Sequence, residues 1–359
     1  MRLLIAAGGT GGHLFPGISV AQAFLELNPG GAVLFVGSDR GLEKTILERA
    51  GFRHVALNVG RIKGEGWIQR LKTFASLPTA FLQARSILKS FRPDVVFGIG
   101  GYSSGPMILA ARWLGIPRAV LEPNAIPGLT NRILGRFVNR IFVAFPKAQE
   151  FFPASKVRLT GTPVRGDLQP SEIPPSVRGD FTLAVLGGSQ GATAVNKAVT
   201  AMLPRLEASG KPFCLLHQTG ASDEGWVKDA YAKTNLACEV TAFVDDMARL
   251  YREADLVVSR AGASTISELL ATRTPSILVP YPFAADDHQR FNADSVAAFG
   301  GAEVVPNAEL SEKLADRVLH YEAARGELAA MREKLAQAQK TPATEAVLRE
   351  ILKLHVSDD

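Results

Sequence analysis

The apolar positions of this chain gather in short continuous runs, and most runs end at glycine or another small residue before a helix-like segment begins. A strand of a parallel sheet reads as a continuous apolar run, because helices cover both faces of the sheet. The alternation therefore predicts an α/β fold with parallel sheets. Strands are expected at residues 2–7, 33–36, 93–99, 119–121 and 141–144 in the first half, and at 181–186, 213–218, 239–243, 256–258 and 276–280 in the second.

One arrangement, a strand followed by a glycine-rich loop and a helix, occurs twice. The first loop reads GGTGGH and leads into a helix expected at 16–27, and the second reads GGSQGA and leads into a helix at 193–207. Two such starts imply two Rossmann-like halves. The composition changes near GTPVR, and several prolines follow, which is typical of a domain boundary. We therefore expect a first domain over 1–161 and a second over 162–341.

Length and composition agree with two globular domains, because 359 residues exceed one ordinary core and 47% of them are hydrophobic. The formal net charge of +5 suits the binding of anionic small molecules or of an anionic membrane surface. It is smaller than the positive charge typical of a nucleic-acid-binding protein. Cys214 and Cys238 lack metal-ligand spacing, which favours a cytoplasmic location. The first apolar run has the length of a strand rather than an export signal, and no run approaches a membrane span, so membrane contact is expected to be peripheral.

The most informative stretch lies between residues 255 and 292. A strand at 256–258 ends in a small-residue turn around Gly262, and a helix follows from Thr265. A helix N-terminus after such a turn binds phosphate through unpaired N–H groups and the helix dipole. Glu268, expected in the first turn, has two oxygens that suit the vicinal diol of a ribose. The alternative is a capping box over 265–268, in which Glu268 only satisfies its own helix.

A second polar segment follows the next strand. The run at 276–280 leads into Asp286, Asp287, His288 and Gln289, which open another helix. Acids and amides can bind adjacent hydroxyl groups, and neighbouring parallel strands end at the same edge of a sheet. The two segments together therefore fit a nucleotide joined to a sugar. In the second glycine-rich loop, the Ser189 hydroxyl is a natural ligand for diphosphate.

The loops of the first half leave several roles open. The fingerprint G-x-G-x-x-G is not completed in GGTGGH, because Leu14 stands in place of the third glycine. His13 is a general base, a diphosphate ligand or a helix cap. Asp39 lies where a dinucleotide-binding protein holds a ribose, but it also fits a helix cap. Glu122 and Asn124 at a strand end either face a ligand or build an ordinary turn.

Residues 61–89 mix bulky apolar and basic side chains. Trp67, Leu71 and Phe74 share one helical face, and Pro78 is expected to end or kink that helix. The segment is either a helix that packs on the sheet with a solvated basic back, or an interfacial membrane helix.

Eight motifs in order carry a resemblance to a known family: GGTGGH, GGYSSGP, the segment 122–132, GTPVR, GGSQGA, FVDDM, SRAGASTISE and DDHQRFNA. In this order they resemble the MurG family of bacterial glycosyltransferases. These enzymes of peptidoglycan synthesis transfer N-acetylglucosamine from its UDP donor to undecaprenyl-diphosphate-linked N-acetylmuramyl-pentapeptide. The resemblance implies a GT-B fold, two Rossmann-like domains facing a cleft, in which the C-terminal helix at 342–359 completes the first domain. It also implies a peripheral location on the cytoplasmic face of the plasma membrane.

The resemblance assigns the UDP-sugar donor to the second domain, where Val244 would meet uracil through its backbone and Glu268 would bind the ribose. Two positions depart from the family pattern, since His288 and Pro123 stand where glutamine is common. The implied donor-binding residues are Asn124, Arg165, Ser189, Phe243, Val244, Met247, Ala263, Ser264, Glu268, His288 and Gln289.

The resemblance assigns the acceptor and the membrane surface to the first domain. The implied acceptor-binding residues are Thr10, Gly11, Gly12, His13, Tyr102 and Ser103, near the lipid diphosphate. The implied membrane patch consists of Trp67, Ile68, Leu71, Phe74, Phe81, Trp113, Arg136 and Arg140.

The implied chemistry is attack of the acceptor C4 hydroxyl on the anomeric carbon as UDP leaves, with inversion to a β-1,4 bond. One base suffices, and we rank His13 above Glu122. No Asp-x-Asp motif occurs, and helix N-termini with Arg165 can stabilise the diphosphate, so neither a metal nor a cofactor is expected. The alternatives are a UDP-N-acetylglucosamine 2-epimerase and a non-catalytic nucleotide-sugar-binding membrane adaptor. A dinucleotide oxidoreductase fits least well.

Overall fold

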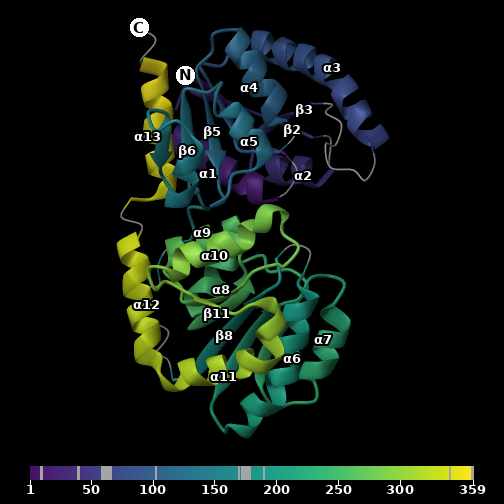
Figure 1. Cartoon of the computed structure of the whole chain (residues 1–359), viewed down its shortest axis with the longest axis vertical. Helices are drawn as coiled ribbons and strands as arrows, with labels where there is room; N and C mark the ends of the chain where they lie inside the picture. Colours follow the sequence, from purple (N-terminus) through teal and green to yellow (C-terminus); the bar gives the residue numbers. More distant parts are fainter. Residues whose placement is uncertain are drawn as a thin grey trace. The chain divides into compact units, whose positions relative to one another are not determined.

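The computed structural model describes residues 1–8, 11–38, 41–57, 67–101, 103–168, 170, 179–188, 191–338 and 341–356. For 11–13, 41, 42, 67–77 and 356 it describes the backbone alone. The chain divides into two compact units (Figure 1). Unit 1 comprises Met1–Arg165 and Thr341–Asp359, and unit 2 comprises Gly166–Lys340. The division therefore falls a few residues beyond the boundary expected from the sequence.

Unit 1 is built on a seven-stranded parallel sheet with the strand order β3-β2-β1-β4-β5-β6-β7. The order reverses between β1 and β4, as in Rossmann-like folds. The strands are β1 (Arg2–Ala6), β2 (Ala32–Gly37), β3 (Arg53–Ala56), β4 (Val95–Gly98), β5 (Arg118–Glu122), β6 (Arg140–Val143) and β7 (Val157–Leu159). The helices are α1 (Gly11–Leu27), α2 (Gly41–Arg49), α3 (Trp67–Phe91), α4 (Ser104–Trp113), α5 (Leu129–Leu134), η1 (Pro146–Phe151) and α13 (Ala343–Val356).

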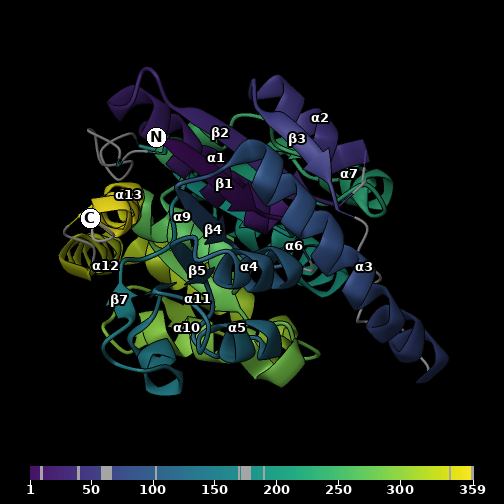
Figure 2. The same cartoon turned by 90° about the horizontal axis from the view of Figure 1, so that it is seen from above.

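Helices cover both faces of this sheet, which explains why its strands read as continuous apolar runs. In β1, Leu3 and Ile5 pack in one cluster with α1 and α13, while Leu4 and Ala6 pack in another with α3, α4 and α5. Figure 2 shows α3 running beside α4, with which it is in contact. The helix does not end at Pro78, because α3 continues through it. A proline removes one backbone hydrogen bond and does not have to end a helix.

The C-terminal helix α13 packs against α1, far from it in sequence. Its apolar face contributes Val347, Leu348, Ile351 and Leu354 to the core of unit 1. Glu350 on the same helix forms ion pairs with Arg140 of β6, at 3.5 Å from Nε, and with Arg158 of β7, at 3.4 Å from Nε. The helix therefore fastens two distant strands of the sheet as well as covering its face.

Unit 2 is built on a six-stranded parallel sheet with the order β10-β9-β8-β11-β12-β13. In Figure 1, α8, α9 and α10 lie on one side of β8 and β11, and α6, α7 and α11 lie on the other. The strands are β8 (Phe181–Leu186), β9 (Phe213–Gln218), β10 (Ala237–Thr241), β11 (Leu256–Arg260), β12 (Ser276–Val279) and β13 (Glu303–Val304). The helices are α6 (Thr193–Ala208), α7 (Glu224–Tyr231), α8 (Met247–Glu253), α9 (Ala263–Thr272), η3 (Ala285–Asp287), α10 (His288–Ala297), η4 (Asn307–Glu309), α11 (Leu310–Ala323) and α12 (Arg325–Ala338).

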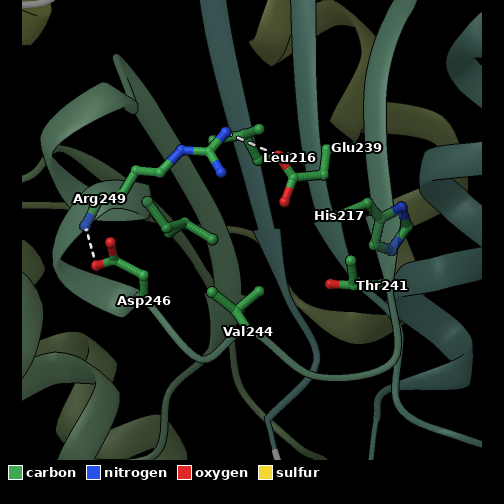
Figure 3. A pocket seen from close by; sticks show the side chains of 8 residues that line it. Leu216, His217, Glu239, Thr241, Val244, Asp246 and Arg249 are labelled. Atoms are coloured by element: carbon green, nitrogen blue, oxygen red, sulfur yellow. Dashed lines mark hydrogen bonds and ion pairs between the residues drawn. The ribbon is translucent and has the colours of Figure 1, made fainter.

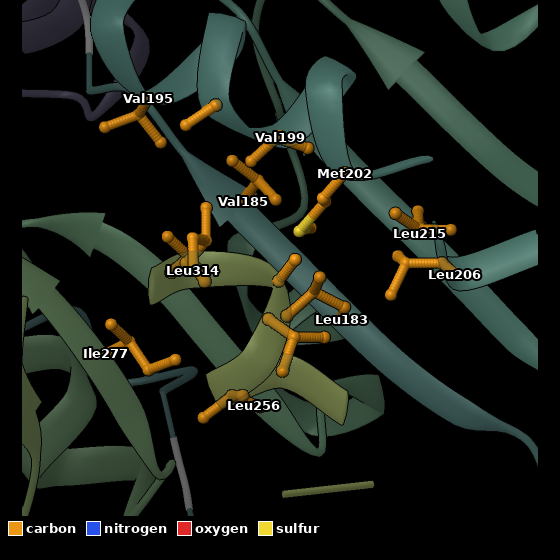
Figure 4. Close-up of a cluster of buried hydrophobic side chains, with 14 of the residues drawn as sticks. Leu183, Val185, Val195, Val199, Met202, Leu206, Leu215, Leu256, Ile277 and Leu314 are labelled. Atoms are coloured by element: carbon orange, nitrogen blue, oxygen red, sulfur yellow. The ribbon is translucent and has the colours of Figure 1, made fainter. Parts of the chain in front are cut away.

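The main core of unit 2 lies between β8 and the helices on one face of its sheet (Figure 4). Leu183 and Val185 of β8 point toward Val199 and Met202 of α6, and Leu314 of α11 completes the cluster. This face of the sheet is therefore covered by buried apolar side chains. The loops at the carboxyl ends of these strands carry the polar residues described next.

Candidate functional site

Each sheet reverses its strand order once, and ligands of open α/β sheets bind at that point, beyond the carboxyl ends of the strands. In unit 1 the reversal lies between β1 and β4, and in unit 2 between β8 and β11. The GGTGGH and GGYSSGP motifs follow β1 and β4, and the GGSQGA and SRAGASTISE motifs follow or overlap the ends of β8 and β11. Each unit thus brings two small-residue loops together at its reversal point. The two units are described in turn.

In unit 2, the loop after β8 lies close to the end of β9. Gly191 has a φ of +75°, and a Cβ atom there would lie 2.4 Å from the Thr219 carbonyl oxygen, so only glycine fits. Gln218 Nε2 donates to the Gly188 carbonyl at 3.0 Å and to the Ala242 carbonyl at 2.9 Å. This one amide therefore ties the glycine-rich loop to the segment that precedes the predicted uracil contact. Ser189 lies outside the described residues.

A small cavity opens beside that segment, where β10 leads into α8 (Figure 3). Val244, Thr241 and Leu216 line it together with His217 and Leu250. Polar groups at the same cavity are paired among themselves: Arg249 Nη2 donates to Glu239 at 2.8 Å, and the Arg249 backbone N–H donates to Asp246 at 2.8 Å. Of the other predicted uracil neighbours, Phe243 is exposed and Met247 is partly exposed.

The α9 helix gives the SRAGASTISE motif a different geometry from the predicted capping box. The helix begins at Ala263 with Gly262 as its N-cap, so Ala263 and Ser264 form the first turn and Glu268 lies in the second. The capping-box alternative is therefore wrong, because the helix starts two residues earlier than Thr265. Glu268 Oε2 instead accepts a hydrogen bond of 2.8 Å from the Tyr251 hydroxyl. The carboxylate is held from α8 rather than by its own helix.

The loop between β12 and α10 has an unusual backbone. Asp286 and Asp287 both adopt left-handed conformations, with φ of 52° and 51°. Two adjacent aspartates in this region store strain, which is characteristic of functional loops. His288 Nδ1 lies 2.7 Å from the Ala285 carbonyl oxygen, and Gln289 Oε1 accepts from the Tyr281 backbone N–H at 2.9 Å. Both side chains are thus oriented by backbone contacts of the same loop.

A buried polar network lies behind the glycine-rich loop of unit 2, and sequence reasoning missed it. His217 lies 3.1 Å from the Tyr231 hydroxyl through Nδ1 and 3.0 Å from Asn196 Oδ1 through Nε2. Asn196 Nδ2 donates to the Thr219 carbonyl at 2.9 Å and to Asp223 at 2.8 Å, which fixes its oxygen toward His217. Burial lowers the pKa of His217 to about 4. The imidazole is therefore neutral and connects α6, α7 and β9.

In unit 1, Glu122 at the end of β5 is 1% exposed and organises the loop that follows it. Its oxygens accept from the Asn124 backbone N–H at 3.0 Å, the Gly128 N–H at 3.1 Å and Asn131 Nδ2 at 2.9 Å, and Asn124 Nδ2 lies at 3.2 Å. Burial raises the pKa of the Glu122 carboxyl, while these donors act in the opposite direction. Both oxygens are occupied, so the geometry suits a carboxylate that orients Asn124.

The loops after β1 and β4 meet closely. The Ser104 hydroxyl lies 3.0 Å from the Ala6 carbonyl oxygen and 2.7 Å from the Gly100 carbonyl oxygen. The hydroxyl of Ser103 is buried without a hydrogen-bond partner in the part of the chain that the structure describes. Such a group is commonly satisfied by a ligand or water. The structure thus offers one unused hydroxyl at the reversal point of unit 1.

Other predicted residues of these loops are less completely described. Gly11, Gly12 and His13 form the first turn of α1 through their backbones, and Thr10 and Tyr102 lie outside the described residues. The role of His13 therefore stays a prediction. Asp39, weighed for a ribose, is also outside them. Arg165 ends unit 1, and its guanidinium carbon lies 5.3 Å from the centre of the Phe15 ring.

The predicted membrane patch is only partly described. Trp67, Ile68, Leu71 and Phe74 lie on α3, where the structure describes the backbone alone.

The remaining members of the patch differ in exposure. Trp113 on α4 is 74% exposed, Arg136 is exposed, and Phe81 and Arg140 are partly buried, with Arg140 engaged by Glu350. Further exposed apolar side chains, missed in the sequence, lie on α5 and just after it: Leu129, Ile133 and Phe137. Among the described helices, none is long and apolar enough to cross a membrane.

Across the described residues, no three histidine, cysteine, aspartate or glutamate side chains gather as a metal site would require. The two cysteines, Cys214 and Cys238, are both free thiols.

Comparison with known proteins gives a consistent result. The Glycosyltransferase family 28 N-terminal domain matches residues 3–143, and the C-terminal domain of the same family matches residues 182–347. A protein of Citrifermentans bemidjiense is 42% identical over 351 residues, covering 97% of this chain and 98% of the relative. A protein of Geobacter metallireducens is 46% identical over 315 residues, covering 87% and 86%. Both are named UDP-N-acetylglucosamine--N-acetylmuramyl-(pentapeptide) pyrophosphoryl-undecaprenol N-acetylglucosamine transferase.

Among solved structures, the crystal structure of Acinetobacter baumannii MurG matches with a TM-score of 0.80 and 32% identity, covering 98% of this chain and 99% of that one. The predicted fold class, two Rossmann-like parallel-sheet domains of GT-B type, is confirmed. With both domains matched and relatives at this identity over nearly its full length, the chain belongs to glycosyltransferase family 28.

Proposed function

We propose that this enzyme transfers N-acetylglucosamine from UDP-N-acetylglucosamine to the C4 hydroxyl of undecaprenyl-diphosphate-linked N-acetylmuramyl-pentapeptide. The observation that carries the proposal is the 42% identity over 97% of the chain to a relative whose name states this transfer. The reaction belongs to peptidoglycan synthesis, and so to cell wall biogenesis, cell shape and cell division. The motifs that carried the sequence resemblance follow strands on both sides of each reversal point, which supports the assignment.

Unit 2 is the donor-binding unit in this proposal. Glu268 binds the ribose hydroxyls, and Val244 meets the uracil through its backbone. The first turn of α9, with Ala263 and Ser264, presents the positive end of the helix dipole to the diphosphate, and the N-cap Gly262 makes no side-chain cap. Ser189 and Arg165 complete the diphosphate contacts.

In this proposal, the segment at the start of α10 binds the sugar of the donor. His288 and Gln289 bind the sugar hydroxyls, and the contacts of both residues with their own loop set the direction of their remaining polar atoms. Asn124 is a further residue proposed for the sugar, and Glu122 accepts hydrogen bonds from its backbone and side-chain N–H groups.

Unit 1 is the acceptor-binding unit. The buried, unused hydroxyl of Ser103 supports an anion near the reversal point between β1 and β4, and the lipid diphosphate is the anion that the proposed acceptor supplies. His13 is the general base, since Glu122 already accepts hydrogen bonds through both oxygens. A His13→Ala variant that kept most of its kcat would reduce His13 to a binding group.

The reaction inverts the anomeric carbon, as expected for one direct displacement. UDP leaves with a diphosphate charge, and the N-terminus of α9 with Arg165 stabilises it without a metal ion. EDTA should therefore leave the rate of transfer unchanged. Inactivation by EDTA with recovery on addition of magnesium would refute this part of the proposal.

Membrane contact is proposed to be peripheral, at the cytoplasmic face of the plasma membrane, because the acceptor is lipid-linked. Exposed apolar side chains beside arginines, such as Trp113 with Arg112 and Ile133 with Arg136, suit an anionic lipid surface. The double variant Trp67→Ser/Phe74→Ser should sediment less with anionic phosphatidylglycerol vesicles. Leu27, an exposed leucine outside the patch, provides the control Leu27→Ser, and equal sedimentation of both variants would remove the idea.

The first experiment is transfer of labelled N-acetylglucosamine from its UDP donor to a short-chain prenyl-diphosphoryl N-acetylmuramyl-pentapeptide. Glu268→Ala is expected to raise the donor KM by about tenfold or more, because a carboxylate bound to two hydroxyls is lost. Glu303→Ala, on β13 in the same unit, is the control for a general loss of carboxylate contacts. Absence of transfer by the wild type, with UDP still bound, would refute the proposed reaction and favour the epimerase or the adaptor.

A further inference from the structure

The carboxylate proposed to bind ribose is held by a buried tyrosine on another helix. Tyr251 of α8 is 1% exposed, and its hydroxyl donates to Glu268 Oε2 at 2.8 Å. Glu268 on α9 is only partly buried. A glutamate at the protein surface ordinarily samples many rotamers, whereas the packed ring of Tyr251 has a fixed position. The hydrogen bond from the buried Tyr251 therefore restricts the rotamers of the Glu268 side chain at the site.

The position of α8 adds to this effect. The helix begins at Met247, directly after the segment of Phe243 and Val244, and Asp246 caps it by accepting from the Arg249 backbone N–H. Its other end lies close to β11, which leads into α9. One short helix thus connects the proposed uracil contact to the hydroxyl that orients the proposed ribose contact.

We propose that Tyr251 is a positioning residue that fixes the Glu268 carboxylate for the ribose hydroxyls and thereby sets the preference for ribonucleotide over 2′-deoxyribonucleotide donors. The proposal rests on the assignment of Glu268 to ribose. An ionised carboxylate has about four lone-pair directions, so accepting one tyrosine hydroxyl leaves capacity for the diol. A preoriented acceptor rejects a sugar that lacks the hydroxyl, because it then stays without that partner.

The test compares the dissociation constants of UDP and 2′-deoxy-UDP by isothermal titration calorimetry with the full-length enzyme. The wild type should bind UDP more tightly. Tyr251→Phe, which removes only the hydroxyl, should weaken UDP by about tenfold and 2′-deoxy-UDP by less, because the deoxy sugar has only one of the two hydroxyl contacts to lose. In the transfer assay the same variant should raise the donor KM and leave kcat within about twofold. Equal weakening of both nucleotides, or an unchanged KM, would overturn the proposal.

A matched control exists in the same unit. The Tyr321 hydroxyl donates to Glu303 Oε2 at 2.6 Å, and Tyr321 is likewise buried, on α11. Tyr321→Phe removes an equivalent tyrosine–glutamate hydrogen bond and should leave both dissociation constants unchanged. If Tyr321→Phe weakened UDP as much as Tyr251→Phe does, the effect would be a general loosening of unit 2, and the positioning role would be refuted.

Two further variants separate this proposal from the function on which it rests. Glu268→Ala should abolish the difference between UDP and 2′-deoxy-UDP, and if it does not, the ribose assignment itself fails. The double variant Tyr251→Phe/Glu268→Ala should bind UDP as weakly as Glu268→Ala alone, since the hydroxyl acts only through the carboxylate. An additional, independent loss in the double variant would overturn the positioning role while leaving the ribose assignment intact.

Discussion

His217 makes the stability of unit 2 dependent on pH. Burial lowers the pKa of His217 in the folded chain to about 4, compared with the ordinary value of 6.5. The folded-state pKa lies below the unfolded-state pKa, so the unfolded chain binds the proton more readily. The stabilisation by the neutral imidazole is fully present above pH 6.5 and is lost as the pH falls toward 4.

The size of the effect follows from these two pKa values. Below both of them the loss of unfolding free energy reaches about 3 kcal/mol, and at pH 5 it is about 2 kcal/mol. A loss of this size is a large share of the stability of an ordinary domain. The neutral imidazole accepts the Tyr231 hydroxyl at Nδ1 and donates from Nε2 to Asn196 Oδ1. Protonation turns Nδ1 into a donor and removes the hydrogen bond from Tyr231, which disturbs the network that holds α6 and α7 to β9.

The assay is urea unfolding at pH 7.5 and pH 5, followed by the fluorescence of Trp226 on α7, with Trp67 and Trp113 replaced by phenylalanine. The comparison is with His217→Gln, which cannot acquire the charge. Between the two pH values the parent should lose about 2 kcal/mol more than the variant, because all other titrating groups are common to both. An equal loss in the two proteins would refute the reasoning, whatever the stability of the variant at pH 7.5.

Three further predictions concern unit 1. Gly101→Ala should abolish transfer without changing the dissociation constant of UDP, because φ is +77° and the new Cβ would lie 2.0 Å from the Gly8 carbonyl oxygen. The control is Gly105→Ala, which has open space around the new Cβ. A Gly101→Ala variant that still catalysed transfer would contradict the geometry. Glu122→Gln should lower the urea midpoint of unit 1 by the equivalent of about 2 kcal/mol, because the new amide N–H₂ would face N–H donors. Trp113 fluorescence follows the unfolding, and an unchanged midpoint would contradict this prediction. Glu350→Gln should speed amide hydrogen exchange in α13, because it removes the ion pairs to Arg140 and Arg158. The control is Glu345→Gln, at an exposed residue of the same helix, and it should leave the exchange unchanged. Equal exchange in the two variants would show that the ion pairs do not hold the helix.

The central strands and the loops after them could be predicted from the sequence, because a strand covered on both faces must be apolar throughout. The strands that escaped prediction are β3, β7 and β13, which lie at sheet edges. Only one neighbour pairs with each, and they are short and partly exposed, as in Glu303–Val304 of β13. Their sequences therefore carry little apolar signal. The helix end expected at Pro78 was wrong for another reason: a proline removes one backbone hydrogen bond, and the rest of the helix can continue around it.

The motifs single out individual residues of the candidate site, whose roles stay predictions, but not the side chains that hold these residues. Glu268 stands out in its motif, whereas its partner Tyr251 is 17 residues away in sequence and reads as an ordinary core aromatic. His217 likewise reads as a polar interruption of an apolar strand, and only the fold brings Asn196 to it, 21 residues away. The capping box failed because Gly262, a residue without a capping side chain, ends up as the N-cap. Long-range hydrogen bonds of this kind leave no spacing pattern in the sequence.

The buried polar residues of unit 2 share one arrangement, which explains why they are tolerated in a core. Gln218 and His217 at the end of β9, and Tyr251 on α8, each use a side chain anchored in the core to hold a group at the carboxyl end of the sheet. A buried polar group is costly unless all its hydrogen bonds are made, and here the partners lie on the loops and helix ends next to the proposed donor. Replacing such a group by an apolar one of similar size would leave its partners without a hydrogen bond and would release the loop it holds. Their presence therefore serves the placement of the loops at the proposed site as well as the stability of the unit.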